Sequence, residues 1–251
     1  MSVPGKAVFF YVLTLLFTTL LGGIQTLGGL PAGFVILSQL APGLAAWAGI
    51  HLHQDEALIR TFFQKQPFWK YAAAGLAPWM IVIVELSIFR DLLDPQTWFA
   101  GIQSVPLALL IWIGLGAFTE ELGWRGYLQP LLRGRLSPLA TSLLVGLAWG
   151  LWHLGNYQHG LVYLMFFVLS TTAYSTVITW LLEPSGGNLL LPWLVHVGVN
   201  LGFLIFDARV TEVRFMIVHS LLWCAAAGIL VLARRKTFFG DDKRELPVEG
   251  V

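Results

Sequence analysis

The sequence predicts an all-α, polytopic membrane protein with about eight transmembrane helices. Of its 251 residues, 57% are hydrophobic and only 12% are charged, whereas a soluble domain carries about 25% charged residues. A water-soluble fold of this length could not hide so much apolar surface, so the lipid bilayer is its natural solvent. The apolar residues also gather in runs long enough to cross a bilayer.

A spanning helix needs roughly 20 mostly apolar residues, and eight stretches of the chain meet this requirement. The first begins just after Lys6, and no A-x-A-like cleavage pattern follows it, so we interpret it as an uncleaved span. The polar stretch 51–70 is long enough for a helix at the membrane interface. The predicted spans cover residues 7–25, 32–51, 71–89, 104–132, 138–156, 160–182, 188–206 and 216–233.

These spans predict one membrane-embedded domain over residues 1–233, followed by a charged cytoplasmic tail over residues 234–251. The tail loses its apolar character and is expected to be disordered. The sequence contains no convincing internal repeat. Its single cysteine, Cys224, excludes an intrachain disulfide framework and a cysteine-based zinc site, and we interpret it as a small packing residue.

The distribution of basic residues predicts how the chain is oriented. With eight spans, both termini lie on one side of the membrane, together with the loops after the second, fourth and sixth spans. Cytoplasmic loops are enriched in lysine and arginine, so the side with 12 of them, against 3 on the other, is predicted to be cytoplasmic. The 12 are Lys6, Arg60, Lys65, Lys70, Arg125, Arg133, Arg135, Arg234, Arg235, Lys236, Lys243 and Arg244, and the 3 are Arg90, Arg209 and Arg214.

Three polar motifs lie inside predicted spans, where charged side chains are costly and are therefore functional candidates. In each motif, two residues spaced i, i+4 share one face of a helix. The helical rise per residue places all three motifs within the bilayer, and we expect them to meet in one polar pocket reached from the cytoplasmic side. The motifs consist of Glu120, Glu121 and Arg125 in the fourth span, Trp149 and His153 in the fifth, and His196 and Asn200 in the seventh.

Such a set of side chains suits the hydrolysis of an amide bond by water. Burial in an apolar site makes a carboxylate a stronger general base, and we expect Glu120 to activate the water with help from His153. Glu121 precedes Arg125 by one helical turn, which predicts a buried structural ion pair. The motif of the seventh span supplies donors that could stabilise the oxyanion of a tetrahedral intermediate.

The three motifs, in this order and on separate hydrophobic spans, resemble those of the CPBP (Abi) family. That family includes the type II CAAX prenyl endopeptidases and bacteriocin-processing and self-immunity proteins. The resembling region runs from about Thr119 to Asn200, and the eight-span plan extends it over most of the chain. The resemblance implies an intramembrane glutamic protease in the cell membrane that acts on a membrane-associated or lipid-modified substrate.

The resemblance also implies individual roles. Trp149 departs from the family pattern, which usually has phenylalanine there, and we expect this to alter the shape of the pocket rather than its chemistry. No cofactor or metal is expected, and the expected partners are a membrane peptide or protein substrate and the lipid bilayer, with no nucleic acid. The implied catalytic residues are Glu120, His153, His196 and Asn200, and the supporting residues are Glu121, Arg125 and Trp149.

Three alternatives stay open at this point. A non-catalytic immunity or scaffold protein could keep the same fold and motifs. A proton-coupled transporter could use buried carboxylates and histidines as a relay, although no inverted repeat is visible. A zinc ion could bind the same side chains, although the sequence lacks H-E-x-x-H. Outside the motifs, Glu85 is expected to reach the interface beside Arg90, and His219 is expected at an interfacial helix end.

Overall fold

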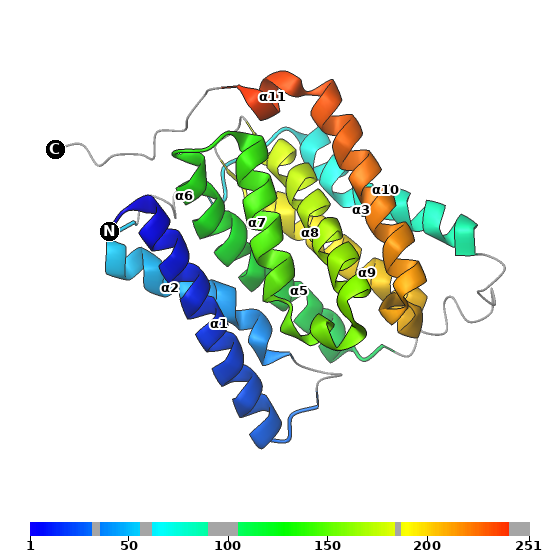
Figure 1. Cartoon of the computed structure of the whole chain (residues 1–251), viewed down its shortest axis with the longest axis horizontal. Coiled ribbons are helices and arrows are strands. Elements are labelled where there is room, and N and C mark those ends of the chain that lie inside the picture. Colours follow the sequence, from blue (N-terminus) through cyan, green and yellow to red (C-terminus); the bar gives the residue numbers. More distant parts are fainter. Residues whose placement is uncertain (32–35, 56–61, 90–104, 184–186, 241–251) are drawn as a thin grey trace.

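A computed structural model shows the chain as an assembly of helices (Figure 1). Within the stretches that the structure describes, the only β contact is an isolated bridge between Phe63 and Asn188. The predicted all-α fold class is therefore confirmed. The described stretches are residues 1–31, 36–55, 62–89, 105–183 and 187–240.

Each predicted span coincides with a helix or with a short series of helical segments. The helices are α1 (Val3–Leu27), α2 (Ala41–His53), α3 (Phe68–Phe89), α5 (Leu107–Glu121), α6 (Gln129–Arg133), α7 (Pro138–Trp152), α8 (Leu161–Leu182), α9 (Leu190–Phe206), α10 (Val213–Ala233) and α11 (Arg235–Phe239). Three short 3-10 helices are η1 (Leu37–Leu40), η5 (Leu154–His159) and η6 (Asp207–Thr211), and one π-helical segment is η4 (Leu122–Leu128).

Five helical stretches among the described residues are long and apolar enough to cross a membrane. They correspond to α1, α3, the combined stretch Leu107–Arg133, α8 and α10, whereas α7 and α9 are shorter apolar helices. The outer face of α1 is suited to contact lipid, because exposed apolar side chains recur there every four residues. The chain is thus a multi-pass membrane protein, while the count of eight spans stays a prediction. The exposed side chains of α1 are Val8, Val12, Leu16, Leu20 and Ile24.

The fourth span is one continuous helical stretch whose middle, η4, is π-helical. The local cause is visible in the backbone: the N–H of Gln129 bonds to the carbonyl of Trp124, five residues back, and Pro130 after it has no N–H to offer. Gly123 lies so close to α2 that a Cβ there would come within 2.5 Å of Pro42. π-helical turns often occur at functional sites, and this one directly follows Glu120 and Glu121.

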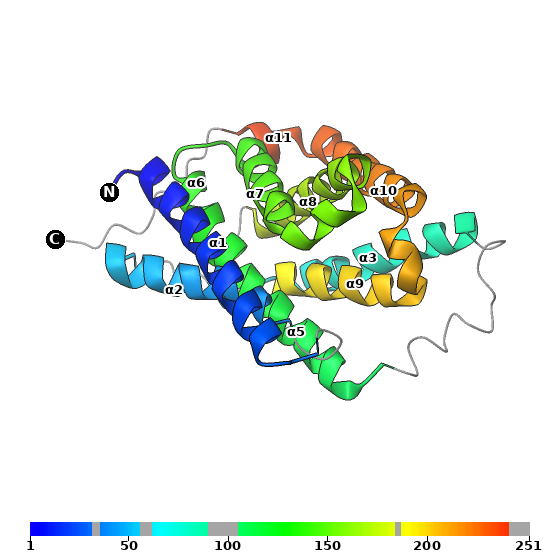
Figure 2. The same ribbon diagram turned by 60° about the horizontal axis from the view of Figure 1, so that its bottom comes forward.

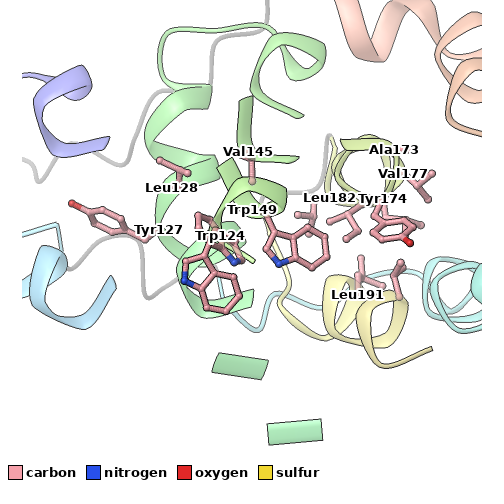
Figure 3. Close-up of a cluster of buried hydrophobic side chains, with 14 of the residues drawn as sticks. Trp124, Tyr127, Leu128, Val145, Trp149, Ala173, Tyr174, Val177, Leu182 and Leu191 are labelled. Atoms are coloured by element: carbon pink, nitrogen blue, oxygen red, sulfur yellow. The ribbon is translucent and has the colours of Figure 1, made fainter. Parts of the chain in front are cut away.

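The helices form two layers with the polar motifs between them. Figure 2 shows α7, α8 and α10 in one layer and α9 and α3 in the other, with α1 and α5 crossing at one side. The helices α7 and α8 pack closely because Gly146 has no side chain; a Cβ there would lie 2.4 Å from the Cα of Thr172. In the core, aromatic side chains from different helices form a band that includes Trp124, Trp149 and Tyr174 (Figure 3).

Two local predictions are corrected. The tail is not disordered at its start, since Arg235–Phe239 forms α11 and Phe238 is buried where α11 contacts α7. Residues 241–251 lie outside the described part. Of the stretch expected to form an interfacial helix, residues 62–67 are not helical and residues 56–61 lie outside the described part.

Candidate active site

The carboxylates of the fourth span lie at the centre of a buried polar cluster. Glu120 and Glu121 are the last residues of α5, and both are at most 1% exposed. The indole N–H of Trp149, on α7, donates a hydrogen bond of 2.9 Å to Oε2 of Glu120. The imidazole of His196, on α9, lies beside both carboxylates. Glu120, Trp149 and His196, from α5, α7 and α9, therefore lie in contact, as the sequence predicted.

Glu121 forms the buried ion pair that the i, i+4 spacing predicts. Nη1 of Arg125 lies 3.0 Å from Oε1 of Glu121, and both side chains are inaccessible to solvent. The guanidinium also lies over the ring of Trp149, with its Cζ 4.4 Å from the ring centroid, which is a cation–π contact. Because the ion pair sits at the start of η4, it anchors the helical stretch to α7 and fixes the position of the neighbouring Glu120.

His196 is oriented by its hydrogen bond to Glu121. Its Nδ1 lies 2.8 Å from Oε1 of Glu121, and its Nε2 lies 3.9 Å from Oε2 of Glu120. Since a carboxylate accepts hydrogen bonds, Nδ1 carries the proton and Nε2 faces Glu120. The ring also packs edge-on against Trp149, with 4.9 Å between the centroids. The imidazole thus has a fixed position beside the candidate base.

Trp149 contacts the candidate catalytic carboxylate directly, a contact that the sequence did not predict. Its indole N–H is a donor to Glu120, and phenylalanine, the usual residue in the family pattern, could not make this contact. One side chain therefore contacts Glu120, Arg125 and His196 at once. The substitution changes the hydrogen bonding of the candidate catalytic carboxylate.

His153 lies at the end of α7 and faces open space. Its Nδ1 is 2.9 Å from the carbonyl oxygen of Trp149, which can only accept a hydrogen bond. This contact places the proton on Nδ1 and leaves Nε2 of the neutral ring as an acceptor, suited to receive a proton from water. The ring packs against Phe167 of α8, with centroids 5.0 Å apart.

Two neighbouring cavities reach the cluster, and His153 lines both. The main cavity has a volume of about 380 Å³ and is bordered by Trp149, His196 and Asn200. The side cavity, of about 250 Å³, is bordered by Glu120 and by residues of α1, α7, η1 and η5. The candidate base thus borders one cavity, and the candidate oxyanion donors border the other. Both are large enough to hold water and a segment of a ligand.

The cavities lie at one end of the helix bundle, which we call the cavity end. The segments η1, η5 and η6 line the main cavity, and both Trp149 and His153 lie at the end of α7 that is remote from Pro138. The sequence predicted access from the side of Arg133, and Arg133 pairs with Glu183 at the opposite end of the bundle. The cavities therefore lie away from the end from which access was expected, and the side of the membrane toward which they open stays a prediction.

We call this opposite end the basic end, because the segments that carry most of the described lysines and arginines lie there: the start of α1, the start of α3, the turn between α6 and α7, and α11. Figure 1 shows the start of α1, the turn between α6 and α7, and α11 toward one side of the molecule. Contacts between distant segments hold it together: Lys6 pairs with Asp55 at 2.5 Å, and the ammonium of Lys70 donates to the carbonyl of Leu181. At the cavity end, the described basic residues are Arg209 and Arg214. The basic end carries Lys6, Lys65, Lys70, Arg133, Arg135, Arg234, Arg235 and Lys236.

Some residues of the cavity walls were missed by the sequence analysis. Gln39 lines both cavities, and its Oε1 is buried with no hydrogen-bond partner among the described residues. Tyr174 lines the main cavity from α8. A sequence signal for it existed, because residues 170–179 hold seven serine, threonine and tyrosine residues inside an otherwise apolar span. Gln39, by contrast, lies in a short segment that shows no distinctive pattern.

The zinc alternative receives no support from the arrangement of side chains. Across the ranges that the structure describes, no group of three or more histidine, cysteine, aspartate and glutamate side chains is arranged to hold a metal ion. His196 instead hydrogen-bonds to Glu121, which is itself paired with Arg125. Such an ion pair competes with metal coordination by the same carboxylate.

Comparisons with known proteins point to one family. Residues 102–202 match the family described as type II CAAX prenyl endopeptidase Rce1-like. The chain is 32% identical over 146 residues to "CAAX prenyl protease 2" of Methanococcus maripaludis, covering 54% of this chain and 52% of that protein.

Similar matches join it to "Lysostaphin resistance protein A" of two staphylococci. The identity is 27% over 188 residues for Staphylococcus epidermidis (71% of this chain, 48% of that protein) and 26% over 233 residues for Staphylococcus haemolyticus (89% and 63%). The chain spans about half to two thirds of the length of these curated relatives. Residues 102–202, which match the Rce1-like family, contain all three motifs, and these matches confirm the resemblance that the motifs indicated.

Proposed function

We propose that this chain is an intramembrane endopeptidase of the CPBP family. The substrate would be a peptide bond in a membrane-associated or lipid-modified protein. The observation that carries the proposal is the contact of Glu120 with Trp149 and His196 at the wall of a cavity that His153 also lines. A buried carboxylate and a neutral imidazole that line the same cavity are suited to activate a water molecule held there.

In the proposed reaction, Glu120 accepts a proton from a water molecule held between it and His153. The oxygen of that water attacks the carbonyl carbon of the scissile amide, and the carbonyl oxygen takes up the negative charge. The C–N bond then breaks, and the leaving amine receives the proton that Glu120 took from water. The Trp149 indole keeps the carboxylate oriented throughout, because it binds one carboxylate oxygen and leaves the other for the water.

The charge on the carbonyl oxygen would be stabilised from the main cavity. Asn200 offers its side-chain amide as a donor there. His196 can donate through Nε2 only when both ring nitrogens carry protons, since Nδ1 binds Glu121. In that form the buried set of Glu120, Glu121, Arg125 and His196 has no net charge, which limits the cost of burying it.

The position of the cavities also bears on how substrate arrives. If the basic end faces the cytoplasm, as the positive-inside rule indicates, the cavities open toward the opposite side of the membrane. Apolar side chains such as Phe167, Val199 and Phe203 line the main cavity. We therefore propose that it receives an apolar or lipid-bearing peptide segment from the extracytoplasmic half of the bilayer.

The decisive experiment compares the purified protein with its Glu120→Gln variant. Both are incubated with a farnesylated peptide of the C-a-a-X type and with a library of unmodified membrane peptides, and the products are identified by mass spectrometry. We expect the wild type to cleave at least one peptide and Glu120→Gln to cleave it at least about 100-fold more slowly, because general-base catalysis is lost.

A matched control is Glu212→Gln, which alters an exposed glutamate beside Arg209 and should cleave at the wild-type rate. Equal cleavage by Glu120→Gln and wild type would remove Glu120 from the mechanism. Cleavage that is lost on strong chelation and restored by zinc alone would move the site to the zinc alternative. A wild type that cleaves nothing while protecting cells against a bacteriocin would favour the immunity alternative.

A further inference from the structure

A second buried polar cluster lies beside the main cavity and takes no part in the reaction described above. It joins Glu85 of α3, His219 of α10 and Tyr174 of α8, which are 1%, 3% and 3% exposed. Nδ1 of His219 lies 2.5 Å from Oε1 of Glu85, and Nε2 of the same ring hydrogen-bonds to the hydroxyl of Tyr174. Both Glu85 and His219 are buried between helices and do not lie at the interface that the sequence predicted for them. Arg90, the expected neighbour of Glu85, lies outside the described residues.

The direction of the hydrogen bonds follows from what each group can do. The carboxylate of Glu85 accepts, so Nδ1 of His219 donates. In the neutral ring, Nε2 then accepts, and the donor is the hydroxyl of Tyr174. The phenolic oxygen also accepts from the side chain of Ser170 and keeps one further lone pair, and an O–H that is engaged in a chain of hydrogen bonds is a better acceptor at its oxygen. Tyr174 therefore offers an acceptor that has a fixed position.

Tyr174 is the member of the cluster that could contact a ligand in the main cavity. Its side chain lines the main cavity together with His196 and Asn200, and its ring lies 6.0 Å from that of Trp149. On the far side, the gap that Glu85 and His219 border is only about 10 Å³, the lower limit for one water molecule. The cluster thus ends at the wall of the main cavity.

Interhelical packing alone explains only part of this arrangement. Polar pairs often tie membrane helices together, and the contact of Glu85 with His219 already ties α3 to α10. Between α8 and α10, the rings of Tyr174 and Trp223 already pack, with their centroids 4.7 Å apart. The hydroxyl of Tyr174 is therefore not needed to hold these two helices together. A phenylalanine at position 174 could keep that ring contact.

We propose that Tyr174 is a substrate-binding residue, whose oxygen accepts a hydrogen bond from a backbone N–H of a peptide bound in the main cavity. His219 and Glu85 are positioning residues, which hold the hydroxyl in that orientation. The proposal rests on the proposed function, because it places a peptide in the same cavity. It assigns to the site a contact with the substrate backbone, which does not depend on the sequence of the peptide.

The test measures binding and cleavage separately. Binding is followed with a fluorescent farnesylated C-a-a-X peptide in the Glu120→Gln background, so that cleavage does not interfere. We expect Tyr174→Phe to weaken binding about tenfold, and in the cleaving protein to raise KM about tenfold while kcat stays within about twofold. Glu85→Gln should weaken binding less, and it should add nothing to Tyr174→Phe, because Glu85 acts through Tyr174.

The matched control is Tyr71→Phe, which removes a hydroxyl that Asn188 and Gln66 contact at the basic end and should leave KM unchanged. Unchanged binding and KM in Tyr174→Phe, with or without a lower thermal stability, would overturn the proposal and leave the proposed function standing. A wild type that cleaves no peptide while Tyr174→Phe still weakens binding would overturn the proposed function and support the peptide contact. A wild type that neither binds nor cleaves would overturn both.

Discussion

The basic end and the cavity end of the helix bundle use buried polar groups for different purposes. At the basic end, Arg133 and Glu183 are buried and joined at 2.9 Å, and the guanidinium also donates to the carbonyl of Leu136. At the cavity end, Glu120 and His153 are also largely enclosed, but both border open space. The first pair closes the fold between α6 and α8, whereas the second leaves acceptors available to a ligand.

This contrast teaches that burial by itself does not identify a catalytic group in a membrane protein. Arg133 and Glu183 are buried, as Glu120 is, so a search for buried charged residues would select all three. Glu120 and His153 differ from the ion pair at the basic end because they line a cavity. In addition, Nε2 of His153 remains an acceptor, since Nδ1 carries the proton. Three experiments can break or sharpen the comparison, and they are ordered by the size of the expected effect.

The largest effect is expected in the accessibility of the two ends from outside the cell. In a Cys224→Ala background, Gly155→Cys marks the cavity end, where a Cβ meets no atom within 4 Å, and Lys236→Cys marks the exposed face of α11. A membrane-impermeant maleimide added to intact cells should label Gly155→Cys and leave Lys236→Cys unlabelled until the cells are opened. The reverse pattern would place the cavities on the cytoplasmic side and refute the access that we propose.

The next effect concerns the stability that the basic end contributes. Arg133→Met removes the guanidinium opposite the buried carboxylate of Glu183, so we expect a loss of about 3–5 kcal/mol of folding free energy. The loss should appear as a lower unfolding temperature in detergent. Arg135→Met, two residues along the chain at an exposed position, should change stability by less than about 0.5 kcal/mol. Equal effects of the two variants would contradict the role of the pair.

The smallest effect is expected from Trp149→Phe, which restores the usual family residue and removes the hydrogen bond to Glu120. A hydrogen bond to a charged group contributes about 1.5–3 kcal/mol and about 1.4 kcal/mol is a factor of ten, so kcat should fall at least about tenfold, provided that the chain cleaves peptides. The control is Trp180→Phe, whose ring packs against Trp69 near the basic end. An unchanged kcat in Trp149→Phe would show that the indole N–H does not orient the carboxylate.

Much of the fold was readable from local patterns. Runs of apolar residues predicted where the helices lie, because the bilayer requires about 20 of them in each span. The i, i+4 spacing in the fourth span predicted the pair of Glu121 and Arg125, because residues so spaced share a helix face whatever the tertiary structure. The prediction for the tail was wrong at Arg235–Phe239, because Phe238 finds a buried position that depends on α7.

The candidate site was readable only in part. The motif residues were selected because polar groups are costly within a bilayer, and Glu120, Trp149 and His196 do lie in contact. The same rule applies to Glu85, a carboxylate inside an apolar span. Its partner His219 could not be recognised from the sequence, because it lies 134 residues further along the chain. No local pattern links two such positions. Their roles, and those of His153 and Asn200, stay proposals until variants are tested.

The sequence by itself determined that the chain is helical and membrane-embedded, and which polar residues lie within its apolar segments. These properties follow from the hydrophobicity of each segment and from helical periodicity, which act over a few turns of one helix. The tertiary structure alone decided that the Trp149 indole binds Glu120, that Tyr174 hydrogen-bonds to His219 and lines the main cavity, and that both cavities lie away from the basic end. Those features depend on how helices cross and tilt, and on which side chains meet between them, and such packing is a property of the whole assembly.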